Sequence, residues 1–376
     1  MRPTRQGDPG ESLTADAVDA DQPATPRKRN TPSGPVVTRF LAKHFWSSAS
    51  FPTLRETIGF QRRAYERATV VVRAYYAVSV YWAISATNAW PGYRQLKQAH
   101  PLWPAHWWFD AFSVRTSVDI IFCAYLAGSI IAMVLPQQRL ARALYAIALL
   151  DWMAFVNGFD KINHDMHSWM FVSFVLVLLP TGKWSGRRRI SERQYFLTVI
   201  WSAQLVILLF YTLTGFWKIY FGLTTAAHGQ LSGFNLSGFS SIVANRVLQS
   251  STKPILGAYF SRTELLGWAL FVGTMYLESS SLLIAFRPRL QRLWGASLIF
   301  FHLGTQLAMG FTFAGNIVLV GLFLVCSPMV PETVHPKEMF FDLPVVHVVS
   351  GQLSSWRHRR VLHRAIADAD PLPSVI

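Results

Sequence analysis

Eight long apolar stretches constrain the fold of this chain more than any other feature of its sequence. They cover approximately residues 68–89, 117–135, 141–158, 162–182, 196–216, 264–286, 293–312 and 315–333. A helix needs about 20 mostly apolar residues to cross a hydrocarbon layer that is roughly 30 Å thick. The sequence therefore predicts an all-α, polytopic integral membrane bundle of about eight transmembrane helices. The fourth and eighth stretches have the shortest apolar cores.

Composition supports lipid as the main solvent of the chain. Hydrophobic residues make up 51% of the sequence and charged residues only 15%. The formal net charge of +15 is compatible with nucleic-acid binding, but the Lys and Arg residues form short clusters between apolar stretches. This placement favours a membrane surface. We therefore expect a multi-pass protein of the cell membrane, with the bilayer as partner and no nucleic acid.

The basic clusters also predict an orientation. With the N-terminus in the cytoplasm, the short basic loops all fall on the cytoplasmic side, as the positive-inside rule requires. These loops carry Arg139 and Arg142, then Lys183, Arg187, Arg188, Arg189 and Arg193, then Arg287, Arg289 and Arg292. The opposite loop, 90–108, carries four tryptophans, which are typical of the membrane–water boundary. Both termini are therefore predicted to be cytoplasmic.

Four regions follow from these patterns. Residues 1–39 are predicted to be a disordered tail, 40–66 a cytoplasmic amphipathic segment or a solvated linker, 67–333 the transmembrane domain, and 334–376 a basic cytoplasmic tail. Within the domain, the long external segment 217–262 contains a predicted short helix near 240–250. It is interpreted either as a cover for a site or as a flexible connector.

Ionisable and thiol groups inside the stretches each need an explanation, because charges are costly in lipid. Asp151 and Glu278 lie deep, and pairing with a neighbouring helix is favoured over chemistry for both. Cys123 and Cys326 are interpreted as core residues rather than as a disulfide.

The candidate site combines residues from three stretches. Helical spacing places Asp160, His164 and His167 on one face, with His167 roughly 7 Å below the outer end of its span. Lys218 ends the next outward-running span and reaches the same depth, and His302 lies midway along the seventh stretch. We expect Lys218 and His167 to be the catalytic pair. The supporting residues are expected to be His302, His164, Asp160, Lys161 and Trp217.

A lysine in a dehydrated, apolar setting can act as a base near neutral pH, and a histidine beside it can donate or accept a proton. Purely structural roles stay open for each residue: a snorkelling lysine and hydrogen-bonded interhelical histidines. Two histidines at i, i+3 are a weak metal signal, so no metal is predicted. Haem held between facing histidines is a further alternative.

Three segments resemble the vitamin K-dependent γ-carboxylase-like family, the horizontally transferred transmembrane (HTTM) domain. They are FDKINHDMHSWMFVSFVLVLLP (159–180), QLVILLFYTLTGFWKIYFG (204–222) and FFHLGTQLAMGFTFAGNIVLVGLFLVCSP (300–328). The first is similar to the family's Phe-Asp-Lys motif, here with Lys161, followed by a His-Ser-aromatic triplet at His167. In the second, the aromatic-x-x-x-Gly-x-x-Lys pattern ends at Lys218. Trp217 stands where the carboxylases carry one of two adjacent lysines.

The resemblance implies an enzyme whose lysine deprotonates a reduced naphthoquinone of the vitamin K or menaquinone type. Reaction with O2 then gives an epoxide and a strongly basic alkoxide, which in the carboxylases removes a glutamate proton before CO2 is added. A small peptide or protein is the implied substrate. The compact form also resembles a non-catalytic membrane accessory protein for peptide maturation, export or immunity, of the sporulation-delaying type. The sequence leaves both functions open.

Overall fold

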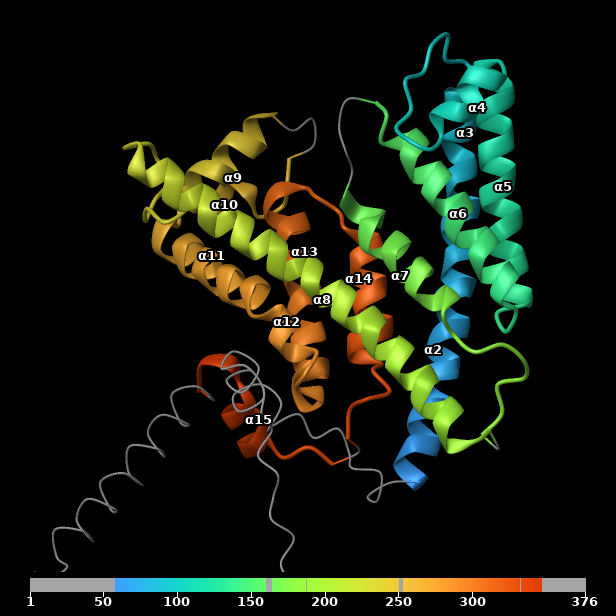
Figure 1. Cartoon of the computed structure of the whole chain (residues 1–376). Coiled ribbons are helices and arrows are strands. Elements are labelled where there is room, and N and C mark those ends of the chain that lie inside the picture. The colour runs from blue at the N-terminus through green and yellow to red at the C-terminus, as the bar shows by residue number, and fades with distance from the viewer. Residues whose placement is uncertain (1–57, 160–163, 187, 250–252, 332, 347–376) are drawn as a thin grey trace, which may run out of the picture.

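The computed structural model describes residues 58–159, 164–186, 188–249, 253–331 and 333–346 (Figure 1). All regular elements in these ranges are helical, so the all-α prediction is confirmed for them. The main helices are α2 (Ile58–Ser85), α5 (Val114–Val134), α6 (Arg139–Val156), α7 (His167–Val177), α8 (Ile190–Ala227), α9 (Gly238–Gln249), α11 (Glu264–Ser279), α13 (Gln291–Met309) and α14 (Ala314–Val320).

Shorter elements connect them. They are η2 (Ala86–Asn88), α3 (Trp90–Tyr93), α4 (His106–Ala111), η3 (His164–Met166), α10 (Gly257–Phe260), α12 (Ser281–Ile284), η4 (Pro288–Leu290), the π-helical η5 (Gly321–Val325) and α15 (Pro336–Asp342). The predicted tail 1–39, residues 40–57 and the end of the chain after 346 lie outside the described residues. Residues 58–66 of the predicted amphipathic segment form the start of α2, which continues through residue 67 without a break.

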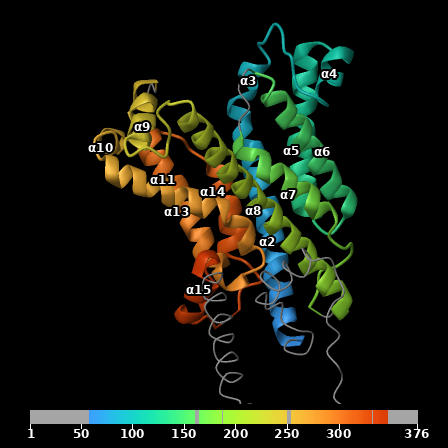
Figure 2. The same cartoon turned by 60° about the vertical axis from the view of Figure 1, so that its left-hand side comes forward.

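The helices form two groups joined by α8, which runs diagonally across the molecule (Figures 1 and 2). On one side α2, α5 and α6 pack together, and on the other α11, α12 and α13 pack near the second half of α8. Helices α7 and α14 contact each other between the two groups. The centre of the bundle therefore contains two of its shorter helices.

Two helices are long and apolar enough, by length and composition, to cross a membrane: Val114–Val134 and Ile190–Ala227. Helices α2, α6 and α13 have 28, 18 and 19 residues, which also suffices in length. Helix α7 has only 11 residues and extends about 16 Å at 1.5 Å per residue. The predicted fourth span is therefore shorter than expected, because a 3₁₀ turn precedes α7 and the helix ends at Val177.

A buried aromatic and hydroxyl cluster joins α2, α6 and α7. The indole of Trp169, fully buried, donates to the hydroxyls of Ser79 and Tyr145, at 3.1 Å each. Its ring stacks on Tyr75 at 4.6 Å between ring centres, and the hydroxyl of Tyr75 donates to the carbonyl of Trp169. These contacts hold the start of α7 against its neighbours.

Three arginines of the predicted cytoplasmic loops are buried rather than free. Arg142 is fully buried in the first turn of α6 and donates to the carbonyls of Pro136, Val177 and Leu179. Arg193 donates to the carbonyl of Gly186, and Arg287 to that of Asp342. Each guanidinium group therefore stabilises the position of a loop or a helix end through hydrogen bonds to backbone carbonyls.

The interpretation of the two cysteines as core residues is wrong. Cys123 and Cys326 are both free and exposed on the surface of the bundle. An apolar stretch does not by itself predict burial of each of its residues, because a helix has a face that packs on its neighbours and a face that does not.

The predicted short helix near 240–250 is confirmed as α9, which packs against α10, α11 and α13. Close packing fixes this external segment: a Cβ on Gly267 would lie 2.7 Å from the ring of Phe239. The indole of Trp268 on α11 also donates to the carbonyl of Phe234 at 3.0 Å. The segment is therefore a packed cap over α11 and α13 rather than a loose connector.

Arg142→Met should lower the free energy of unfolding by about 3 kcal/mol, because it leaves buried carbonyls at the end of α7 without a donor. The measurement is denaturant unfolding of the purified protein, with Arg139→Met as a control that removes an exposed charge from the same turn. Equal stability of the two variants would contradict this role of Arg142.

Candidate functional site

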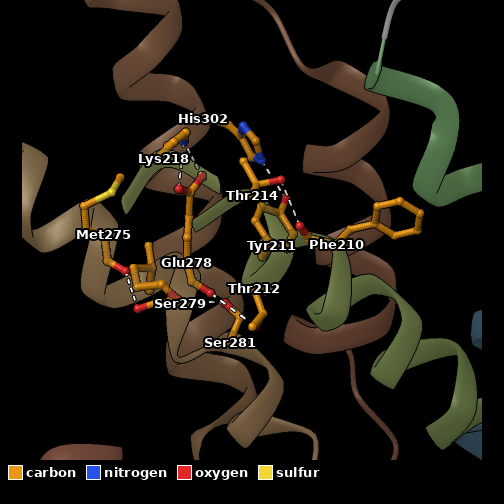
Figure 3. Close-up of polar contacts among 11 residues, drawn as sticks. Phe210, Tyr211, Thr212, Thr214, Lys218, Met275, Glu278, Ser279, Ser281 and His302 are labelled. Atoms are coloured by element: carbon orange, nitrogen blue, oxygen red, sulfur yellow. Dashed lines mark hydrogen bonds and ion pairs between the residues drawn. The ribbon is translucent and has the colours of Figure 1, made fainter. Parts of the chain in front are cut away.

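An ion pair between a buried acid and a partly exposed lysine connects α8 and α11. The ammonium nitrogen of Lys218 lies 2.7 Å from both carboxylate oxygens of Glu278 (Figure 3). The Glu278 side chain is 2% exposed and that of Lys218 is 36% exposed. The predicted pairing of Glu278 with a neighbouring helix is therefore confirmed. The partner is the lysine that the sequence had singled out as the base.

Gly215 explains why the two helices come so close at this point. A Cβ at Gly215 would lie 2.6 Å from the backbone nitrogen of Ser279 and 2.9 Å from the Cβ of Glu278. Both distances are shorter than real Cβ contacts, so only glycine allows this approach. Lys218 follows three residues later, on the same side of α8. Gly215 thus sets the helix separation that lets the lysine reach Glu278.

Glu278 also lies next to a break in the helix backbone, since α11 ends at Ser279 and α12 begins at Ser281. The hydroxyl of Thr212 on α8 donates to the carbonyl of Glu278 at 3.3 Å and accepts from the N–H of Leu282 at 2.8 Å. Peptide groups freed by a helix break need such partners in an apolar environment. Thr212 therefore stabilises the break beside the acid.

His302 and Tyr211 form the second polar pair of the site. The hydroxyl of Tyr211 lies 2.6 Å from Nε2 of His302, which is 4% exposed (Figure 3). Nδ1 of His302 is buried and has no hydrogen-bond partner in the described part of the chain. Phe301 and Phe313 surround the imidazole, with ring centres 5.0 and 5.1 Å away. This leaves one imidazole nitrogen available to a ligand or a water molecule.

Aromatic rings connect the two pairs. The ammonium of Lys218 lies 5.4 Å from the ring centre of Phe301, the residue before His302. The prediction that His302 shares an interior with Lys218 thus agrees with these contacts. The site brings together an amine, a carboxylate, an imidazole and a phenol from α8, α11 and α13.

His167 is placed differently from the expectation. It is the first residue of α7 rather than a residue roughly 7 Å inside a span. His164 precedes it in the 3₁₀ turn η3, and the two imidazole centres are 5.0 Å apart. The ammonium of Lys218 contacts Glu278 and Phe301. The predicted catalytic role of His167 beside Lys218 stays a prediction.

Trp217 takes no part in the contacts of the ion pair among the described residues. Trp217 is 65% exposed on the surface of α8 and contacts the ring of Tyr220. Asp160 and Lys161 lie outside the described residues. Asp165, in the same segment, accepts from the N–H groups of Gly315 and Asn316 at 3.4 Å each, so it caps the start of α14.

The sequence analysis did not include Tyr211 or Glu278 among the candidate site residues. Tyr211, Gly215 and Lys218 are spaced i, i+4 and i+7, which places them on one face of α8. This spacing was a signal that a polar face runs along the fifth stretch. Glu278 was recognised as costly in lipid, but its partner depends on which helices are neighbours, and periodicity does not contain that information.

Within the described ranges no group of three or more His, Cys, Asp or Glu side chains is placed to hold a metal ion. No protein-family model, no curated protein and no solved structure matches this chain. The resemblance to the γ-carboxylase-like family therefore rests on the three sequence segments alone.

Lys218→Met should lower the free energy of unfolding by about 1–3 kcal/mol, because it leaves the buried carboxylate of Glu278 unpaired. Adding Glu278→Gln should recover part of the loss, since the double variant has no uncompensated charge. Denaturant titration measures the free energy of unfolding of the single and the double variant, with Lys253→Met as the control at an exposed position. Strictly additive effects of the two substitutions would show that the pair is not coupled.

Proposed function

We propose that the chain is a polytopic membrane protein with eight membrane segments and both termini in the cytoplasm. The segments α7 and α14–η5 are short, but they lie between the two groups of helices, where α7 packs on α6 and α8 and α14–η5 packs on α13. Irregular or short helices are tolerated at membrane depth in that position. The basic connections α5–α6, α7–α8 and α12–α13 lie at one end of the molecule with α15 and the start of α2, which supports this orientation (Figure 1).

Reporter fusions test this topology. Alkaline phosphatase inserted after Gln230, in the external segment, should be active, because the enzyme requires export. The same reporter attached to either terminus should be inactive. Activity at a terminus, or inactivity after Gln230, would reject the proposed orientation.

We further propose that the protein is a membrane enzyme in which Lys218 removes a hydroxyl proton from a reduced naphthoquinone. The observation that carries this proposal is the hydrogen bonding of the Lys218 amine to both oxygens of a carboxylate that is 2% exposed. Lysine is a base only when neutral, and Glu278 provides a place for the proton that it must give up.

The surroundings of the pair fit a planar aromatic ligand. Rings of Phe301, Phe313 and Tyr211 lie around His302, and Lys218 faces the ring of Phe301. The side chain of Lys218 is partly exposed, so a lipid-soluble molecule can approach the amine while Glu278 stays covered. The free Nδ1 of His302 offers a hydrogen bond to an oxygen of such a ligand.

Protons move in two steps within this arrangement. The Lys218 proton passes along the 2.7 Å hydrogen bond to Glu278, which gives a neutral amine and a carboxylic acid. The amine then takes the hydroxyl proton of the ligand and becomes an ammonium that stabilises the resulting anion. A reduced naphthoquinone, when bound, supplies this acidic hydroxyl and the ring that O2 converts to an epoxide. Coupled glutamate carboxylation with CO2 remains an optional extension of this proposal.

Two histidines take supporting roles in the proposal. His302 orients the ligand oxygen through Nδ1, while Tyr211 holds the ring in place through Nε2. His167, from the neighbouring α7, stabilises negative charge that develops on the ligand. Helix α7 packs directly on α8, with the rings of Phe171 and Phe210 at 5.2 Å, which supports a role for both helices in one site.

Purified protein supplied with reduced menaquinone and O2 should form the quinone epoxide. Lys218→Ala should reduce the rate at least about a hundredfold, the usual contribution of a general base. Lys253→Ala removes an exposed lysine from the same external segment and should leave the rate unchanged. Product is measured by chromatography and mass spectrometry, with size-exclusion profiles as a check on folding.

Turnover that is unchanged in a folded Lys218→Ala variant would reject the catalytic assignment. Absence of epoxide from the wild-type protein, together with co-purification of one small secreted peptide, would instead favour the non-catalytic accessory function.

A further inference from the structure

The external segment between Lys218 and Glu264 has an unusual charge pattern. Residues 219–263 contain three basic residues, Arg246, Lys253 and Arg262, and no acidic residue. Positive charge is normally concentrated on the cytoplasmic side of a membrane protein. In the orientation proposed above, this segment faces the other way. The positive-inside rule therefore does not explain the positive charge of this segment, whereas an anionic partner would.

Arg246 on α9 is the best defined of these cations. Its guanidinium carbon lies 4.0 Å from the ring centre of Phe311, so the planar group is stacked and fixed in orientation. Its Nε is buried and has no hydrogen-bond partner in the described ranges, and no carboxylate pairs with it there. An arginine held in this way leaves its remaining N–H donors open to an acceptor from outside the described chain.

Apolar side chains around α9 and α10 are exposed to the surroundings. Ile242, one helical turn before Arg246, is 46% exposed, and Tyr259 on α10 is 54% exposed. Ile255, which precedes α10, is 81% exposed. The two helices pack together, since a Cβ on Gly257 of α10 would touch the side chain of Val247. The packed pair of α9 and α10 therefore combines a fixed cation with exposed apolar side chains and an exposed tyrosine.

We propose that Arg246 and the surrounding surface of α9 and α10 bind an anionic phospholipid of the outer leaflet. The phosphate accepts hydrogen bonds from the guanidinium fork, and the acyl chains lie along Ile242 and Ile255. Charge complementarity with the acid-free segment favours this ligand over a neutral lipid. The combination of apolar surface and a basic residue favours it over a free anion. The proposal concerns lipid binding and does not depend on quinone turnover.

The location of this surface connects it to the candidate site. Phe311, on which Arg246 stacks, contacts Phe313 at 6.3 Å between ring centres, and Phe313 contacts His302 at 5.1 Å. A bound phospholipid would therefore lie beside the aromatic side chains that reach His302.

Native mass spectrometry of the full-length protein in detergent, titrated with phosphatidylglycerol, tests this proposal. Arg246→Gln should weaken binding of the first phosphatidylglycerol about tenfold, because it removes the charged hydrogen bonds to the phosphate. Arg262→Gln is the matched control: it removes the same charge from the same segment, but at an exposed position without an aromatic partner, and should bind like the wild type. Phe311→Leu, which keeps the charge but removes the ring, should weaken binding to a smaller extent.

Several outcomes would overturn the proposal. Equal losses in Arg246→Gln and Arg262→Gln would indicate non-specific attraction, and wild-type binding by both Arg246→Gln and Phe311→Leu would exclude this surface. Equal affinity for phosphatidylcholine would remove the selectivity for an anionic lipid. Displacement of the lipid by inorganic phosphate, or by an acidic peptide at a similar concentration, would point to a different class of ligand. Epoxide formation, measured separately, reports on the proposed function alone.

Discussion

The structure depends on one constraint: every peptide group at a helix break inside the bundle needs a hydrogen-bond partner, because the apolar interior supplies none. Side chains from neighbouring helices meet this requirement at the sites where helices end or change their winding. Arg142 binds the carbonyls at the end of α7, and Thr212 binds both sides of the α11–α12 break. Gln204 donates to the carbonyl of Phe323 in the π-helical η5 at 2.7 Å. Polar residues in apolar stretches thus allow a bundle with short and broken helices.

The candidate site is located where such a break meets a close helix contact. Gly215 brings α8 against α11, and the break after Ser279 places Glu278 where Lys218 can reach both of its oxygens. An ion pair with a buried carboxylate is rarely the most stable choice for a helix interface, since well-packed apolar residues are often as good or better. Its presence in an apolar bundle, with His302 and a ring of aromatic side chains beside it, is the physical reason for assigning chemistry to this point.

The cap formed by α9 and α10 connects the candidate site to the proposed lipid-binding surface. It packs on α11 and α13, the helices that carry Glu278 and His302. A lipid bound at Arg246 would therefore touch the same structural unit that holds the ion pair. The acid-free composition of this segment is explained if its cations face phosphate groups rather than protein carboxylates.

Part of the fold and of the candidate site was determined by the sequence alone. The length of the apolar stretches predicted an all-helical bundle, and the local sequence predicted the short helix α9. The cost of charge in apolar surroundings predicted that Glu278 pairs with another helix, and it also made Lys218 and His302 candidate site residues. Tertiary structure alone decided which groups meet: that Glu278 pairs with Lys218, that Tyr211 bonds His302, that Arg142 is buried and that both cysteines are exposed. Such contacts depend on which helices are neighbours and how closely glycine lets them approach. A helical period specifies the face of a residue but not the helix opposite to it.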